Sequence, residues 1–110
     1  YAAMRFPVSG GLAAHDRVLL RAESDRPRRI WAQLRVDRAG EGERWGQSFY
    51  VGPGLEERAL RFEDFRPLVP GSASTPPLAR IESLLLVIDT INTVPGSTGR
   101  VAITDLWLAR

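Results

Sequence analysis

Apolar and polar side chains alternate along residues 29–38, and this alternation constrains the fold more than any other feature of the chain. The alternating residues are Ile30, Ala32, Leu34 and Val36 in one set, and Trp31, Gln33, Arg35 and Asp37 in the other. Successive side chains of a β-strand point to opposite faces of its sheet. The segment is therefore predicted to be a strand whose first set lines a hydrophobic core and whose second set points outward.

The rest of the chain consists of short strand-like segments separated by glycine and proline. Besides 29–38, we expect strands at residues 1–8, 17–23, 44–51, 58–62, 81–90 and 101–108. The segment 81–90 is largely apolar on both faces, which is typical of a central strand covered on both sides. Residues 62–65 are expected to form at most one helical turn, because Pro67 would end it. Short strands with this punctuation predict an all-β sandwich or barrel.

Length and composition indicate one globular domain over residues 1–110. The chain begins with Tyr1 rather than methionine, so we expect it to be a piece excised from a larger protein. The absence of cysteine excludes disulfides and cysteine-ligated metals, and the single histidine, His15, excludes a histidine cluster. The longest nearly apolar run, residues 81–88, is too short to span a bilayer, so no membrane insertion is expected.

The charged residues give no clear sign of a nucleic-acid partner. All fifteen basic residues are arginine, but thirteen acidic residues are interspersed with them and the formal net charge is only +2. A nucleic-acid-binding surface would show basic residues clustered on one face. The densest basic stretch, Arg26–Arg29, lies between two expected strands and is interpreted as a solvated loop. We therefore expect no nucleic acid among the partners.

The order of the segments resembles that of a known superfamily. Its elements are Val18–Ala22, Ile30–Arg35, the pair Trp45 and Phe49, Leu60–Pro67 with its Phe62-x-Asp64-Phe65 motif, Ile81–Asp89 and Gly99–Leu106. This set resembles the galactose-binding-like jelly-roll superfamily, most closely the complex I intermediate-associated protein domain and related carbohydrate-binding modules. The resemblance implies an antiparallel jelly-roll β-sandwich plugged at one end by the two phenylalanines. Arg58 departs from it, since a core apolar residue is usual at that position.

The outward row of Trp31, Gln33 and Arg35 is the best candidate for a binding site. An indole can stack on the C–H face of a sugar ring, while amide and guanidinium groups bond to its hydroxyls. The resemblance implies that the outer surface of one sheet is concave and that glycans bind there. Tyr50 would extend the row if Phe49 points into the core. The alternative is that another segment or domain covers the row.

Asp105 is a candidate ligand for a structural calcium ion, because the resemblance implies a carboxylate near such an ion at this position. Calcium needs several hard oxygen ligands, for which Asp16 and Asp89 are the available carboxylate partners. The alternative is that Asp105 forms local hydrogen bonds in a turn. The expectation for the whole chain is that it has no cofactor.

No arrangement typical of an enzyme is present, since the sequence lacks a Gly-x-Ser-x-Gly motif, a phosphate loop and metal-ligand spacing. We therefore expect a non-catalytic ligand-binding module, carbohydrate-binding as the resemblance implies. It would be a monomer, extracellular or periplasmic, within a larger secreted or envelope protein. The alternative is a structural or protein-interaction domain that docks the same row on a partner, because exposed Trp, Tyr and Arg also anchor protein interfaces. A third interpretation is a sensory domain that binds a small molecule.

Overall fold

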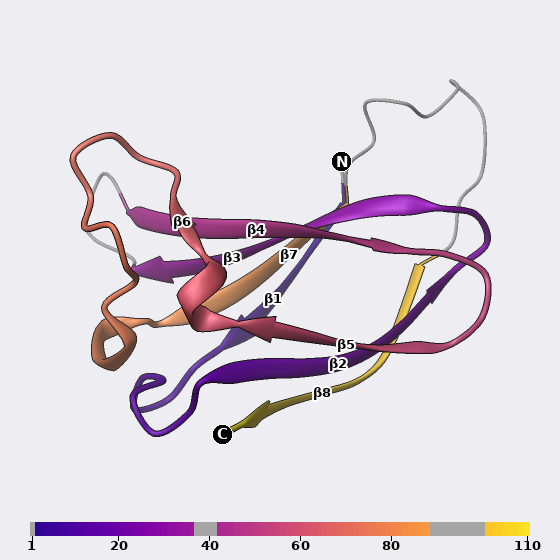
Figure 1. The fold of residues 1–110 in the computed structure, drawn as a ribbon, viewed down its shortest axis with the longest axis horizontal. Coiled ribbons are helices and arrows are strands. Elements are labelled where there is room, and N and C mark those ends of the chain that lie inside the picture. Colours follow the sequence, from indigo (N-terminus) through magenta and orange to yellow (C-terminus); the bar gives the residue numbers. More distant parts are fainter. Residues whose placement is uncertain (1, 37–41, 89–100) are drawn as a thin grey trace.

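Two antiparallel β-sheets pack face to face and form a sandwich (Figure 1). The computed structural model describes residues 2–36, 42–88 and 101–110. The first sheet has five strands in the order β1-β7-β3-β4-β6, and the second has three in the order β5-β2-β8. This architecture confirms the predicted all-β antiparallel sandwich.

The strands agree closely with the segments expected from the sequence. They are β1 (Ala2–Pro7), β2 (Arg17–Ser24), β3 (Arg28–Val36), β4 (Glu43–Val51), β5 (Glu56–Arg61), β6 (Arg66–Pro67), β7 (Ser83–Ile88) and β8 (Val101–Ala109). Two single-turn 3-10 helices, η1 (Phe62–Asp64) and η2 (Leu78–Arg80), complete the described elements. The sequence did not predict β6 or η2, and residues 89 and 90 of the expected seventh strand lie outside the described residues. Neither described helix is long enough or apolar enough to cross a membrane.

The hydrophobic core lies between the two sheets. Its fully covered members include Val18 and Leu20 from β2, Ile30 and Leu34 from β3, and Trp45 from β4, all with 0% exposure. Buried and half-buried residues alternate along β3 from Ile30 to Val36, which confirms the predicted period of two. The sequence therefore placed the inward and outward faces of this strand correctly.

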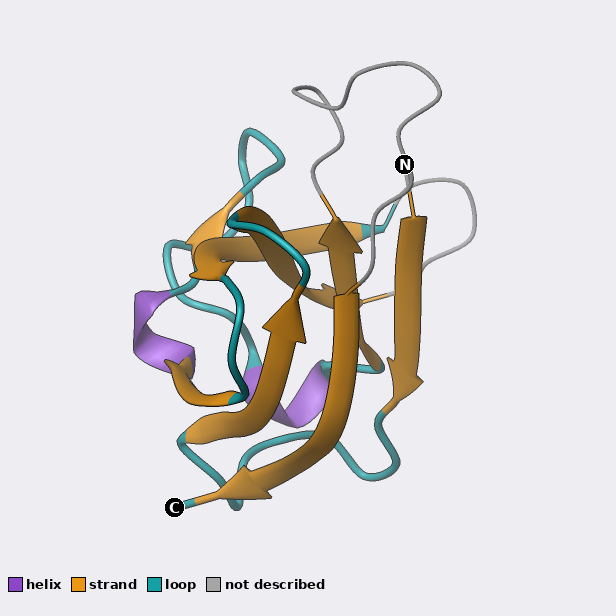
Figure 2. Cartoon of the chain, turned by 90° about the vertical axis from the view of Figure 1, so that its right-hand side faces the viewer, coloured by secondary structure: helices purple, strands orange, loops and turns teal. Residues whose placement is uncertain are grey.

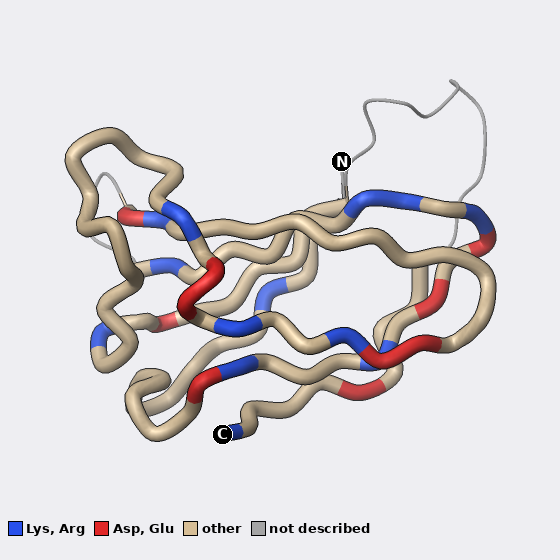
Figure 3. Tube along the Cα trace, in the orientation of Figure 1, with Lys and Arg blue, Asp and Glu red and all other residues tan. Residues whose placement is uncertain are grey.

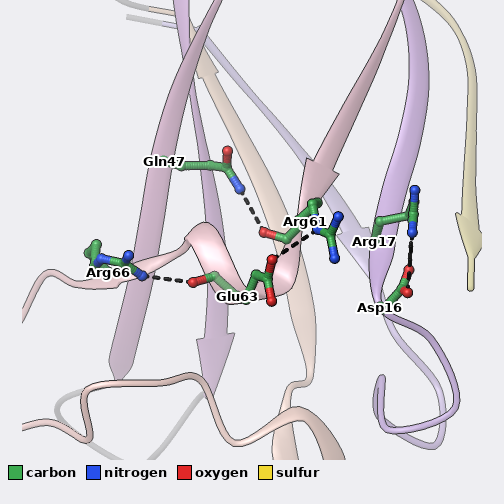
Figure 4. Close-up of polar contacts among 6 residues, drawn as sticks. All are labelled: Asp16, Arg17, Gln47, Arg61, Glu63 and Arg66. Carbon is green, nitrogen blue, oxygen red and sulfur yellow. Dashed lines mark hydrogen bonds and ion pairs between the residues drawn. The ribbon is translucent and has the colours of Figure 1, made fainter.

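One end of the sandwich is plugged by the aromatic pair of the Phe62-x-Asp64-Phe65 motif. Phe62 and Phe65 are 2% and 0% exposed, and their ring centroids lie 6.5 Å apart with a tilt of 57°. Both 3-10 helices lie at this end, opposite the turn that joins β4 to β5 (Figures 1 and 2). Gln47 fixes η1 to the larger sheet, because its Nε2 donates a hydrogen bond to the carbonyl of Arg61 at 3.0 Å (Figure 4).

Strand β7 occupies a central position, where it pairs with β1 on one side and β3 on the other. The N-terminal segment thus completes this sheet. The prediction that both faces of β7 are covered is only partly right for its outward face, where Ser83 is 0% exposed. Leu85 and Val87, which point outward, are only half buried, whereas Leu84 and Leu86 are 2% and 0% exposed in the core. Core packing accounts for one apolar face of this strand, and the other contributes to an accessible surface.

Arg58 lies on β5 opposite Leu20, at the core position where the resemblance predicts an apolar side chain. Its guanidinium reaches out of the sandwich: Nε donates a hydrogen bond to the carbonyl of Tyr50 at 3.3 Å, and Nη1 donates one to the carbonyl of Glu57 at 3.2 Å. A long stem can pack against apolar neighbours while its charged head stays solvated. Arg58 therefore fits this position without placing a charge in the core.

Candidate functional site

The outward side of the five-stranded sheet collects all four residues that the sequence predicts for binding. The antiparallel register places directly opposite residues on the same face. We call this surface the outer face; by register it consists of Ala3, Arg5, Pro7, Arg29, Trp31, Gln33, Arg35, Arg44, Gly46, Ser48, Tyr50, Arg66, Ser83, Leu85 and Val87. The face spans all five strands; Gly46 and Ser83 are buried on it, and its other members are exposed or half buried.

Trp31, Gln33 and Arg35 follow one another along the outward side of β3, and each is half buried. Tyr50 projects from β4 with 62% exposure, while Phe49 beside it is 8% exposed and packs in the core. The prediction that Tyr50 points outward if Phe49 points into the core is therefore confirmed. Trp31 pairs with Ser48, so Tyr50 is its diagonal neighbour, at about 7–8 Å.

Arg29 belongs to this face. It stands both in the expected strand 29–38 and in the basic stretch that was interpreted as a solvated loop. The loop interpretation is wrong for Arg28 and Arg29, because β3 already begins at Arg28. The Arg29 guanidinium lies 5.0 Å from the centroid of the Trp31 ring, which is within cation–π range. Extending the period of two back from Arg35 would have revealed its direction. Arg29 thereby restricts the orientation of the indole that we expect to contact a ligand.

Gly46 forms the middle of the face between Gln33 of β3 and Arg66 of β6. A Cβ atom at this position would lie 2.9 Å from Cδ1 of Leu68, so the Leu68 side chain sits against the glycine. Leu68 itself is 40% exposed and adds an apolar surface at this edge. It lies in the loop after β6, where apolar and polar residues do not alternate regularly, so its position could not be predicted from the sequence.

Asp105 lies on the other sheet, on β8, and is exposed. Its carboxylate is 3.8 Å from a guanidinium nitrogen of Arg21, and Arg21 is also 3.8 Å from Glu57 and within cation–π range of Trp107. Within residues 2–36, 42–88 and 101–110, no three His, Cys, Asp or Glu residues are grouped to hold a metal ion. Calcium binding by Asp105 stays a prediction. In the structure, the Asp105 carboxylate lies beside the guanidinium of Arg21.

Of the two aspartates considered as partners of Asp105, Asp89 lies outside the described residues and Asp16 has another role. The Asp16 carboxylate accepts a hydrogen bond of 2.7 Å from Nε of Arg17 (Figure 4). This hydrogen bond lowers the pKa of Asp16 below its ordinary value and raises the pKa of Arg17. The pair caps the start of β2, away from the outer face.

The polar groups at the described strand positions of the outer face can form hydrogen bonds with a ligand. Its outward positions carry arginine, glutamine, serine and tyrosine, with no carboxylate and no histidine among the described strand residues. Hydrolysis of a glycosidic bond requires two carboxyl groups on either side of the bond. A pocket of about 300 Å³ lies at the plugged end, beside His15, Asp16 and Glu63, and none of its lining residues belongs to the outer face.

The two sheets and their antiparallel pairing define a jelly-roll β-sandwich. This chain is similar in structure to the family 11 carbohydrate-binding module of the cellulosomal cellulase Lic26A-Cel5E of Clostridium thermocellum, with a TM-score of 0.72, 15% identity and coverage of 97% of this chain and 65% of that one. It is equally similar to a family 11 carbohydrate-binding module from Clostridium thermocellum in complex with a β-1,3-1,4-mixed-linked tetrasaccharide (TM-score 0.72, 13% identity, 97% and 66% coverage).

The chain spans slightly less than two thirds of the length of these two modules. No protein-family model and no curated protein sequence matches it. At these identities the likeness shows the fold, so a ligand has to be argued from the residues of this chain.

Proposed function

We propose that this chain is a non-catalytic carbohydrate-binding module that holds a glycan chain across its outer face. The observation that carries the proposal is the alignment of Trp31, Gln33 and Arg35 on β3 beside the exposed ring of Tyr50. Aromatic rings next to hydrogen-bonding side chains on one accessible surface are the two elements that sugar recognition needs. The likeness to two carbohydrate-binding modules, one of them in complex with a tetrasaccharide, supports the same function.

The mechanism combines stacking with hydrogen bonding. Trp31 and Tyr50 would stack on the apolar faces of neighbouring sugar residues, and Gln33 and Arg35 would bond to hydroxyl groups along the chain. Binding on an open face leaves part of the ligand solvated and uses few side chains. We expect a dissociation constant on the order of 0.1–1 mM, equivalent to about 4–5.5 kcal/mol of binding free energy.

We further propose that the module is monomeric and belongs to a larger extracellular or periplasmic protein. The support for this setting is that one structural neighbour belongs to a cellulosomal cellulase. A module of this kind would keep its parent protein close to a polymeric substrate, and weak affinity per site would suffice when several modules act together.

Affinity electrophoresis through gels that contain single polysaccharides tests the proposal. The panel includes a neutral mixed-linked β-glucan and acidic polysaccharides, each compared with a gel without polysaccharide. We expect retardation by at least one polymer, and loss of that retardation in Trp31→Ala and Tyr50→Ala. Trp107→Ala is the matched control, because Trp107 is 36% exposed on the opposite sheet.

Circular dichroism establishes that each variant is folded. Retardation that persists in both outer-face variants, or is lost equally in the control, would contradict this site. A folded domain that no polysaccharide retards would contradict the function and favour a protein partner for the same row.

A further inference from the structure

The outer face carries an unbalanced charge. Five arginines, Arg5, Arg29, Arg35, Arg44 and Arg66, occupy outward positions of the five-stranded sheet, and no aspartate or glutamate occupies one among the described residues. Glu43 begins β4, but it pairs with Val36 and so lies on the inward side by register. The arginines come from four different strands, which explains why the clustering is not visible in the sequence.

The outward side of the three-stranded sheet provides an internal comparison. There Arg17, Arg21 and Arg61 alternate with Glu23, Glu57 and Asp105, so the charges balance. Arg21 lies 3.8 Å from both Glu57 and Asp105, and Arg61 lies 3.1 Å from Glu63. Figure 3 shows blue and red segments interspersed along β5, β2 and β8, at the lower side of the view. The arginines of this sheet thus have protein carboxylates as neighbours.

Two arginines of the outer face, Arg44 and Arg66, differ from those of the opposite sheet. Arg44 is exposed, and its guanidinium makes no hydrogen bond or ion pair within the described residues. Arg66 is also exposed, and its Nη1 donates hydrogen bonds to the carbonyls of Glu63 at 2.7 Å and Phe65 at 3.3 Å, so within the described part of the chain it bonds to neutral oxygens. Guanidinium groups that bond only to neutral oxygens or to water can still take an anion.

The register fixes how these charges are arranged. Arg5, Leu85, Gln33, Gly46 and Arg66 form one row across the five strands, so the two terminal arginines are separated by four strand spacings, or about 19 Å. Arg35 and Arg44 are directly opposite each other in the next row. Trp31 and Tyr50 lie beyond Gln33 on the other side. The face therefore has a basic half with four of the five arginines and an aromatic half, in which Arg29 lies beside Trp31 and Tyr50.

We propose that the carbohydrate bound by this face is an anionic polysaccharide, one that carries carboxylate or sulfate groups at regular intervals. This inference rests on the proposed function and specifies its ligand class. The aromatic half stacks on sugar rings, and the arginine fork matches the geometry of carboxylate and sulfate oxygens. Charge complementarity favours the anion, because no carboxylate occupies an outward strand position among the residues that the structure describes. The low net charge of the chain, +2, favours a glycan over a nucleic acid, whose affinity depends on neutralising many phosphates.

The test measures affinity by electrophoresis or calorimetry against four probes: polygalacturonate, heparin, neutral mixed-linked β-glucan and single-stranded DNA. Each is measured at 50 mM and 1 M NaCl. We expect at least one of the first two to bind at least roughly tenfold more tightly than the neutral glucan at low salt. This preference should shrink at high salt, since the Debye length falls to about 3 Å. The comparison of polygalacturonate with heparin distinguishes carboxylate from sulfate as the preferred anion.

Arg44→Gln and Arg66→Gln identify the face, and Arg21→Gln is the matched control with the same charge change on the opposite sheet. Each of the first two should weaken binding of the acidic polymer by about two- to fivefold and leave neutral-glucan binding unchanged. The control should change neither. Circular dichroism verifies that all three variants are folded.

Salt-insensitive binding of the neutral glucan alone would overturn the anionic ligand and leave the proposed function standing. An equal effect of Arg21→Gln would overturn the assignment to the outer face, and tighter binding of DNA than of either acidic polymer would overturn the ligand class. Binding of none of the four probes would contradict this inference together with the proposed function.

Discussion

Trp45 offers the sharpest test of how the sandwich holds the loop at the edge of the outer face. Its side chain is 0% exposed, and its indole Nε1 donates a 2.8 Å hydrogen bond to the carbonyl of Ala73. This bond fixes the loop that carries Leu68, the side chain that lies against Gly46. Trp45→Phe keeps an aromatic ring in the core but removes the donor and the pyrrole part of the indole.

The stability that Trp45→Phe loses has two components, the hydrogen bond and the volume of the side chain. A net hydrogen bond contributes about 0.5–1.5 kcal/mol, and Ala73 is exposed, so water can replace the lost donor and keep this component within that range. The volume removed from a close-packed core adds about 1–2 kcal/mol. We therefore expect the free energy of unfolding to fall by about 1.5–3.5 kcal/mol, and Tm to fall by roughly 6–15 °C for a domain of this size.

Urea unfolding followed by circular dichroism measures the effect, with Trp107→Phe as the control. Trp107 is 36% exposed on the opposite sheet, so its replacement should cost less than about 1 kcal/mol. An unchanged stability of Trp45→Phe would refute the reasoning. So would an equal cost for the two variants, because burial and the hydrogen bond are the only differences invoked.

Three further predictions concern the frame of the domain. Gly11→Ala should lower the free energy of unfolding by about 2–4 kcal/mol, because φ is +75° and the new Cβ would lie 2.5 Å from the carbonyl oxygen of Ala79. Gly10→Ala is the control: its φ is +80° but the space around it is open, so it should cost about 1 kcal/mol. Equal losses of stability for the two variants in thermal unfolding would contradict this prediction. The hydrogen bond from Arg17 lowers the pKa of Asp16 in the folded state, so the ionised carboxylate stabilises the fold at pH above its unfolded pKa near 3.8, and this stabilisation is lost as pH falls through the lower folded pKa. Asp16→Asn should remove this pH dependence of stability. An NMR titration that shows no lowered pKa for the Asp16 carboxyl would refute the prediction. A chelator should leave Tm unchanged and Asp105→Asn should lower stability by less than about 1 kcal/mol, as for an exposed ion pair; a fall of Tm on chelation that calcium restores would show a metal site instead.

Much of the fold was predictable because local periodicity determines it. The alternation from Ile30 to Val36 gave both faces of β3, and these faces fixed where Trp31, Gln33 and Arg35 point. The two phenylalanines of the end plug were predictable for a similar reason, because a motif between two strands has to cover the end of the core. The periodicity of apolar residues indicates which side chains are buried, and burial determines the orientation of the side chains in β3.

Other features depend on contacts between distant segments and could not be predicted. Strand β6 has two residues and exists through its pairing with Trp45 and Gly46. The clustering of Arg5, Arg44 and Arg66 on one face arises from strand order, which the sequence does not state. Arg29 stood in the expected strand, but its contact with the Trp31 ring could not be predicted from the sequence.

The most direct test of the central claim, that a glycan binds on the outer face, is an NMR titration of the three indole N–H signals. The chain has three tryptophans: Trp31 on the outer face, Trp45 in the core and Trp107 on the opposite sheet. Addition of neutral and acidic oligosaccharides should shift the Trp31 signal in a saturable manner and leave the Trp45 and Trp107 signals nearly unchanged. A shift of Trp107 with Trp31 unmoved, or no shift with any oligosaccharide, would contradict the account.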